Sequence, residues 1–64
     1  PAIRSSAITY VEYNSATTEL VITFTGGRSY TYYGVPERLY EEFMASPSKG
    51  AFFNKLIREN FSER

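Results

Sequence analysis

RSYTYYGVP, the stretch Arg28–Pro36, follows a pair of glycines and ends in a proline. Tyr30 and Tyr32 are two residues apart, so an extended strand places both rings on the same face. Aromatic rings on one face of a strand need a cover, and a proline fits the first position of a helix, where its missing N–H costs nothing. The stretch therefore predicts a last strand whose tyrosines lie under a following helix.

Two earlier segments have the patterns of strands. Ile8–Tyr13 is rich in β-branched and aromatic residues, which favour strands. Small polar residues follow at Asn14–Thr18 and predict a turn. Glu19–Thr25 alternates between two faces, which is typical of a half-buried strand. Its apolar face consists of Leu20, Ile22 and Phe24.

The loop before the tyrosines decides which face they take. If the two glycines alone formed the turn, the tyrosines would lie on the face opposite Leu20 and Ile22. A three-residue loop, Thr25–Gly27, with its last glycine left-handed, instead pairs Ile22 with Tyr30 and Leu20 with Tyr32. Only this second register gives one coherent core, so we predict it. In the first hairpin a four-residue loop pairs Val11 with Ile22 and Tyr13 with Leu20.

Two helices are expected after the third strand. The first runs from Pro36 to near Ala45, and Ser46–Gly50 separates it from the second, with Ser46 or Ser48 as N-cap. The apolar positions are Leu39, Tyr40, Phe43 and Met44 in the first helix, and Phe52, Phe53, Leu56 and Ile57 in the second, with Phe61 as an anchor.

The predicted fold class is therefore α+β, a three-stranded antiparallel β-meander followed by two α-helices packed on one face (β-β-β-α-α). We expect a single domain over residues 1–64, with an ordered core of about residues 5–61. Because the chain begins with proline rather than methionine, we expect a processed chain or an expressed fragment.

Composition argues against catalysis. The chain has neither cysteine nor histidine, which removes thiolate ligands, imidazole ligands and the usual near-neutral base. Glu37, Glu41 and Glu42 flank an ordinary apolar stripe and should be solvated, so they form no tuned carboxylate pair. We predict no enzyme activity, no catalytic residue, no metal and no cofactor.

Apolar runs are too short to cross a membrane. The longest, Leu20–Phe24, is far below the length that spans a bilayer. The absence of cysteine fits a reducing compartment. We therefore expect a soluble, cytoplasmic protein without a membrane partner, whose oligomeric state the sequence leaves open.

Several short motifs occur in the order found in a known family. The chain resembles the KTSC domain from roughly Ser5 to Phe61. That family is named for its place at the C-terminus of some lysyl-tRNA synthetases, and it also occurs as small stand-alone bacterial and phage proteins. The matching motifs are Ser5-Ser6, Ile8, Val11-Glu12-Tyr13-Asn14, Leu20–Phe24, Gly27 with Tyr30-x-Tyr32-x-x-Val35-Pro36, and Ser48-x-Gly50-x-x-x-Asn54-x-x-Ile57-Arg58.

Two positions depart from the family pattern. Asn14 stands where an aspartate is expected, and Glu12 stands where a small residue is commoner. Neither change threatens the fold. The synthetase context of the family implies an RNA-binding role, by association rather than by mechanism.

Tyr30 and Tyr32 have two readings. Aromatic side chains on a sheet can stack on the bases of RNA. In the predicted register, however, both rings face the helices and belong to the core. The open face would then carry Tyr10 and Tyr33, which lie roughly 16 Å apart by strand rise and spacing, too far for one stacking platform.

The start of the second helix is a candidate anion site. Ser48-Lys49-Gly50 would offer free backbone N–H groups, a positive dipole end and a glycine that lets a phosphate approach. The alternative is an ordinary serine cap on a solvated basic face. Residues 46–64 carry a net charge of +2, four Lys or Arg against two Glu. The predicted nucleic-acid or anion contacts are Arg28, Ser48, Lys49, Gly50, Asn54, Lys55 and Arg58.

Two main functions remain open from the sequence, besides the binding of a small nucleotide-like anion at Ser48–Gly50. The first is a small non-enzymatic binding module that contacts RNA, with tRNA as one candidate, through the basic second helix and its N-terminus. The second is a protein–protein interaction adaptor. Because 7 Lys or Arg balance 7 Asp or Glu, no global field attracts nucleic acid, and RNA binding should be weak and sensitive to salt.

Overall fold

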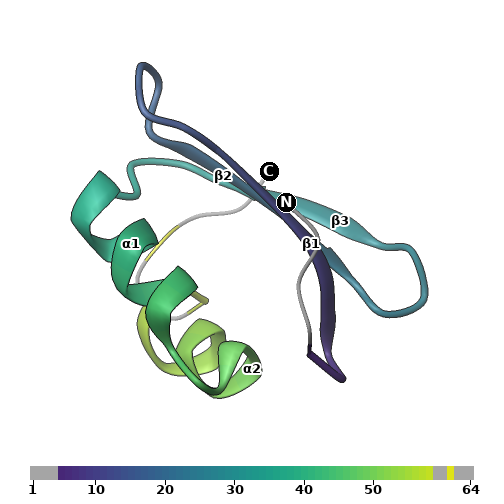
Figure 1. Cartoon of the computed structure of the whole chain (residues 1–64). Helices are drawn as coiled ribbons and strands as arrows, with labels where there is room; N and C mark the ends of the chain where they lie inside the picture. Colours follow the sequence, from purple (N-terminus) through teal and green to yellow (C-terminus); the bar gives the residue numbers. More distant parts are fainter. Residues whose placement is uncertain (1–4, 59–60, 62–64) are drawn as a thin grey trace.

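The computed structural model describes residues 5–58 and residue 61. Three antiparallel strands form one sheet in the order β1-β2-β3, and the helices follow on one side of it (Figure 1). The fold is therefore the predicted α+β arrangement. Its elements are β1 (Ile8–Asn14), β2 (Glu19–Phe24), β3 (Ser29–Tyr32), α1 (Glu37–Ala45), α2 (Lys49–Phe52) and a π-helical segment, η1 (Phe53–Ile57).

The strand register is the predicted one. Ile22 pairs with Tyr30 and Leu20 pairs with Tyr32. The connecting loop is the expected three-residue loop, because the N–H of Phe24 donates to the carbonyl oxygen of Arg28 at 2.7 Å. Gly27 has the predicted positive φ of 93°, and Gly26, for which no such value was predicted, has a φ of 103°. Two adjacent glycines thus provide backbone angles that other residues rarely adopt.

β1 contains a bulge that the sequence pattern did not reveal. Ile8 pairs with Phe24, whereas Tyr10 pairs with Thr23, so Thr9 is the extra residue. The extra residue turns Ile8 back towards the helices, and Ile8 is fully buried. Tyr10 remains on the open face with 41% of its surface exposed.

The first hairpin loop is held by Asn14 and contacts the segment before α1. The side-chain oxygen of Asn14 accepts hydrogen bonds from the N–H groups of Ala16 and Thr17, at 2.9 and 3.3 Å. Thr18 then adopts a positive φ of 58°, and its carbonyl oxygen accepts a hydrogen bond from Val35 at 3.0 Å. An asparagine therefore performs the turn-forming role in place of the expected aspartate.

The core lies between the sheet and the helices. Phe43 is the buried residue of α1, which starts one residue later than predicted, with Pro36 as the residue before it. Phe61 packs against the core as predicted. The buried set consists of Ile8, Val11, Leu20, Ile22, Tyr32, Val35, Phe43, Phe53 and Ile57.

The second helix differs from the expected regular α-helix. The N–H of Arg58 donates to the carbonyl oxygen of Phe53 at 2.8 Å, an i→i−5 bond that widens the turn. Each residue of a wide turn advances by a smaller angle than in an α-helix. Ile57 therefore stays in the core, while Leu56, predicted to be apolar core, is 41% exposed.

Tyr13 connects the sheet to α1. Its ring stacks on that of Tyr40, with centroids 4.5 Å apart and planes 10° apart. Its hydroxyl donates a hydrogen bond to the carbonyl oxygen of Val35 at 2.6 Å. Loss of water around the phenol, together with the charge of Glu37, raises the pKa of Tyr13 above its ordinary value of 10.0.

This raised pKa predicts a loss of stability in alkali. The folded form holds the Tyr13 proton more tightly than the unfolded chain, so the stabilisation is complete below the ordinary pKa of 10.0 and is lost as pH rises through the raised pKa. Tyr13→Phe should lower the free energy of unfolding at neutral pH by about 1 kcal/mol, the value of one hydrogen bond, and flatten the decline in alkali. Urea unfolding at several pH values measures both effects. An equally steep decline in the variant would contradict this assignment.

Candidate functional site

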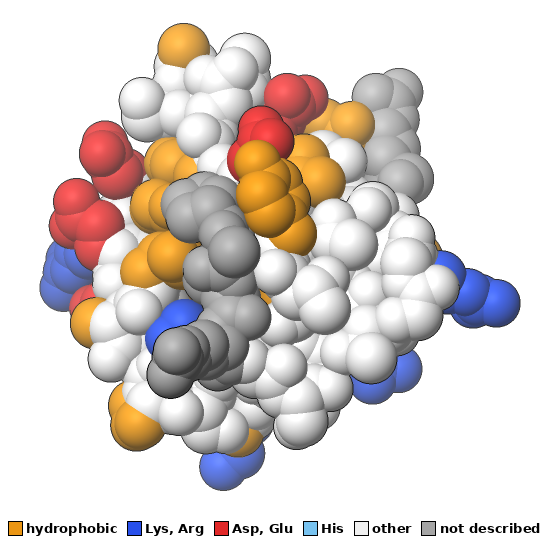
Figure 2. Space-filling view, turned by 45° about the vertical axis from the view of Figure 1, so that its right-hand side comes forward, with side chains coloured by type: hydrophobic (Ala, Val, Ile, Leu, Met, Phe, Trp, Pro, Cys, Tyr) orange, Lys and Arg blue, Asp and Glu red, His pale blue; other side chains and the backbone are white. Residues whose placement is uncertain are grey.

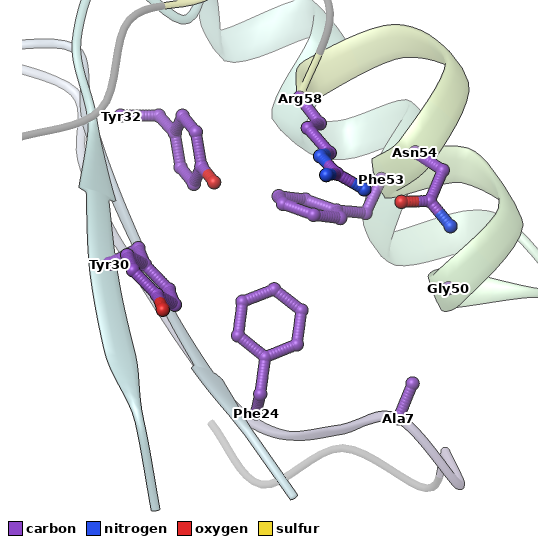
Figure 3. A pocket seen from close by; sticks show the side chains of 8 residues that line it. All are labelled: Ala7, Phe24, Tyr30, Tyr32, Gly50, Phe53, Asn54 and Arg58. Carbon is purple, nitrogen blue, oxygen red and sulfur yellow. The ribbon is translucent and has the colours of Figure 1, made fainter.

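One wall of the candidate site comes from the sheet. Because Tyr30 and Tyr32 face the helices, their rings project from β3 towards η1, and Phe24 projects from the end of β2 on the same side (Figure 3). Tyr32 is 5% exposed and Tyr30 is half-buried. Tyr32 therefore belongs to the core, as predicted, whereas Tyr30 packs against the core and keeps an accessible side.

Aromatic contacts hold this wall in place. The ring of Phe24 meets those of Tyr30 and Phe53 edge to face, with centroids 5.7 and 5.0 Å apart. Tyr32 meets Phe53 in the same way at 5.4 Å. Edge-to-face pairs add stability beyond the area that they bury. The four rings thus form one continuous packed surface that connects β2 and β3 with η1.

The other wall comes from α2 and η1, and the wide turn arranges it. Gly50, Asn54 and Arg58 are four residues apart, and in a regular α-helix each step of four overshoots a full turn by about 40°. The π-turn between Asn54 and Arg58 removes part of this drift. All three residues consequently lie along the helical wall and line the same pocket (Figure 3). Wide turns of this kind occur frequently at functional sites.

Between the two walls lies a pocket of about 320 Å³. Asn54 and Arg58 are exposed, whereas Phe53 is 6% exposed, so the polar groups lie towards solvent and the rings lie deeper. Gly50 contributes only backbone, and a Cβ at this position would lie 3.5 Å from the Cβ of Ala7. The lining residues are Ala7, Phe24, Tyr30, Tyr32, Gly50, Phe53, Asn54 and Arg58.

The described lining of the pocket is rich in hydrogen-bond donors and positive in charge. Among the described residues that line it, Arg58 is the charged one and none carries a carboxylate. Within residues 5–58 and 61, the side chains of Arg58 and Asn54 make no hydrogen bond or ion pair. A guanidinium and an amide are therefore available to a ligand that offers acceptor atoms, such as a phosphate or a carboxylate.

The remaining predicted contacts lie outside this pocket. Ser48 occupies the N-cap position of α2, but its side chain makes no capping hydrogen bond. The Nζ of Lys49 donates to the carbonyl oxygen of Ser46, which directs this ammonium onto the loop. Arg28 is exposed at the second hairpin and Lys55 is exposed on η1. Anion binding at the start of α2 stays a prediction.

Lysine and arginine side chains do not gather into one patch on the face shown in Figure 2 but lie apart from one another. Acidic side chains on the same face lie at the left edge and near the top. The structure therefore brings Gly50, Asn54 and Arg58 of the predicted contacts together with Tyr30 and Tyr32. It does not join Arg28, Ser48, Lys49 or Lys55 to that pocket.

A second hollow, of about 470 Å³, lies beside the first hairpin loop. Glu12 and Glu19 line it, so its charge disfavours anions. Nearby, the hydroxyl of Tyr10 donates to Glu12 at 2.8 Å, and this hydrogen bond, with the charge of Glu12, raises the pKa of Tyr10. This hollow would suit a cationic ligand rather than RNA.

The described residues hold no cluster of three or more metal-binding side chains. Within the same part of the chain, no helix is long and apolar enough to cross a membrane. Phe24, Phe53 and Ala7 line the pocket although the sequence analysis did not assign them to a site. Phe24 could have been found, because it shares the apolar face of β2 with the partners of the two tyrosines.

Comparisons with known proteins agree on one family. A crystal structure of a KTSC domain protein from Yersinia pestis matches with a TM-score of 0.96 and 38% identity, covering 100% of this chain and 90% of that one. A protein of Tsukamurella paurometabola is 37% identical over 59 residues, which are 92% of this chain and 88% of that protein.

Longer proteins contain the same segment. The lysine–tRNA ligase of Nostoc punctiforme is 39% identical over 56 residues, which are 88% of this chain but 10% of the ligase. The sequence pattern of the KTSC domain matches residues 4–61. The chain therefore belongs to the KTSC domain family.

Proposed function

We propose that this chain is a small non-enzymatic binding module whose ligand is RNA, with tRNA as one candidate. The observation that carries the proposal is the convergence of Tyr30, Tyr32, Asn54 and Arg58 on one pocket. Aromatic rings beside a guanidinium are the combination with which proteins bind unpaired nucleotides. The resemblance of the chain to a segment of proteins named lysine–tRNA ligase supports the same ligand class.

The charge of the chain sets the expected strength. Its formal net charge is 0, so few phosphates can be neutralised at once. For about two to three contacts with single-stranded RNA, the logarithm of the binding constant should fall with the logarithm of salt concentration with a slope of about −1.4 to −2. Binding is therefore expected to be weak at physiological salt. A cytoplasmic location fits a chain without cysteine, because disulfides are rare in that compartment.

Arg58→Glu should abolish the retention of RNA, because it replaces the guanidinium with a carboxylate, and none of the other described lining residues is charged. Fluorescence anisotropy with labelled single-stranded RNA, at low and at moderate salt, measures the effect. Arg38→Glu is the matched control, because Arg38 lies on α1, 87% exposed beside Glu42, and outside this pocket.

Two results would contradict the proposal. One is a wild-type protein that binds no RNA at low salt. The other is an Arg58→Glu variant that binds as well as Arg38→Glu. Changing Lys49 and Lys55 to glutamate tests, in the same assay, whether RNA contacts the exposed basic surface of the helix. If this double variant loses RNA binding while Arg58→Glu keeps it, the contact lies on that surface rather than in the pocket.

A protein-interaction adaptor is the second candidate, and the open face of the sheet supports it. Tyr10 is 41% exposed on that face, next to Glu12, and the helices of the described residues lie on the other side of the sheet (Figure 1). A partner bound there should be retained after nuclease treatment and should be insensitive to Arg58→Glu. Tyr10→Ala should release it. Retention of a partner by the Tyr10→Ala variant would contradict a contact through this face.

A further inference from the structure

The pocket between β3 and η1 has the size and chemistry of a site for one nucleotide. Its volume of about 320 Å³ is at the lower end of the range for small-ligand sites, which begins near 300 Å³. A paired and stacked base cannot enter a pocket of this kind without leaving the duplex. The occupant must therefore be a free mononucleotide or an unpaired nucleotide of an RNA strand.

The pocket lining is apolar in the interior and polar at the mouth. Phe53 and Tyr32 are 6% and 5% exposed, and they form the interior with Phe24. Asn54 and Arg58 are exposed, and they come from the helical wall (Figure 3). A ligand that fits this order has a flat aromatic body for the rings and an anionic group for the guanidinium.

Each polar side chain of the pocket can bind a different part of a nucleotide. The planar guanidinium of Arg58 can form two parallel hydrogen bonds with a phosphate. The amide of Asn54 can both donate and accept, as the edge of a base requires. Since neither side chain is engaged within residues 5–58 and 61, no existing hydrogen bond must break when a ligand enters.

Gly50 keeps the end of the pocket near Ala7 open. Its backbone φ is not positive, so the glycine is not required by the conformation of the helix. A Cβ there would meet Ala7 at 3.5 Å, an ordinary contact, and would occupy part of the cavity. An alanine at position 50 is therefore compatible with the fold but reduces the volume of the pocket that is open to a ligand.

We infer that this pocket holds a single nucleotide, with its base against the rings of Tyr30 and Phe24 and its phosphate on Arg58. The inference rests on the proposed RNA-binding function and assigns to it the chemical group that is recognised. A free nucleoside monophosphate and an unpaired residue of an RNA strand share this chemistry, and separate experiments distinguish them.

The first experiment titrates the wild-type protein with the four nucleoside monophosphates, the corresponding nucleosides and inorganic phosphate, following amide chemical shifts by NMR. At least one monophosphate should bind about ten-fold more tightly than its nucleoside, because one charge-assisted contact is lost in the nucleoside. The shifts should centre on Gly50, Asn54 and the two tyrosines. Arg58→Gln should remove the advantage of the phosphate, whereas Arg38→Gln should keep it.

Gly50→Ala separates binding from folding. The thermal midpoint should rise by about 2–4 °C, because alanine favours a helix over glycine. Affinity for the monophosphate should fall about ten-fold, because the added methyl group occupies part of the pocket. A variant that is more stable and binds as tightly as the wild type would overturn the inference.

The second experiment compares a single-stranded oligonucleotide with the matching duplex. Preference for the single strand, lost in Gly50→Ala, supports the inference for RNA. If RNA is retained but no monophosphate binds and Gly50→Ala changes nothing, the pocket assignment is overturned while the proposed RNA binding stands. If a monophosphate binds but RNA does not, the pocket assignment stands and the proposed function is overturned.

Discussion

Deletion of Gly27 should prevent the chain from folding. A two-residue turn of Thr25 and Gly26 would keep the register but would force Thr25 into a left-handed conformation. A three-residue loop over Thr25, Gly26 and Arg28 instead pairs Phe24 with Ser29, which changes the register of β3 by one. Tyr30 and Tyr32 would then move to the open face, and Ser29 and Thr31 would point at the helices. Burial of one large side chain contributes about 1.5–3 kcal/mol. The two losses together approach the roughly 3–10 kcal/mol expected for a domain of 64 residues.

Far-UV circular dichroism and urea titration measure this loss. Gly27→Ala is the matched control, since it keeps the loop length and adds only the strain of a positive φ, about 1–2 kcal/mol. The control should remain folded with a lower midpoint. A deletion variant that unfolds cooperatively close to the midpoint of the control would show that loop length does not set the register.

Phe43→Ala should have the second largest effect. Phe43 is fully buried and is the residue through which α1 enters the core, where its ring lies 5.6 Å from that of Phe52. Removing a buried phenylalanine ring costs about 3–5 kcal/mol, through lost burial and the cavity that remains. In a domain of this size that loss should leave a large unfolded fraction at 25 °C.

Phe43→Leu and Leu56→Ala serve as controls, and urea unfolding compares all three. The leucine variant keeps most of the buried volume and should lose less than half as much stability. Leu56 is 41% exposed, so its truncation should change stability by about 0.5 kcal/mol or less. If Leu56→Ala were as damaging as Phe43→Ala, the outward orientation that the π-turn gives Leu56 would be wrong.

The sheet could be predicted from the sequence because its signals are local. Alternating apolar residues in β2 and the length of the glycine loop together determine which side chains share a face. The pairing of Leu20 with Tyr32 follows from these two facts alone. The bulge at Thr9 could not be predicted, since one extra residue in a strand of β-branched and aromatic residues leaves the overall pattern unchanged.

The π-turn escaped prediction for a different physical reason. Leu56 and Ile57 are both apolar, and either spacing of hydrogen bonds places Ile57 in the core. The two spacings differ in how Phe53 packs against the rings of Phe24 and Tyr32 on the strands. That packing depends on residues distant in sequence.

The candidate site was predicted in separate parts. The sequence indicated Tyr30 and Tyr32 as one motif and Gly50, Asn54 and Arg58 as another. Their meeting depends on how the helix crosses the sheet, which no local pattern specifies. Lys49 also has the residue type of an anion contact, yet its ammonium binds the carbonyl of Ser46.

The described helices lie on one side of the sheet (Figure 1). The hydrophobic interior and the pocket consequently share a layer, and the described side chains on the opposite face of the sheet belong to neither. A larger polypeptide that incorporates this unit can rest against that opposite face while the pocket mouth still opens to solvent. The architecture therefore suits both a free-standing protein and an appended module, the two settings in which its relatives occur.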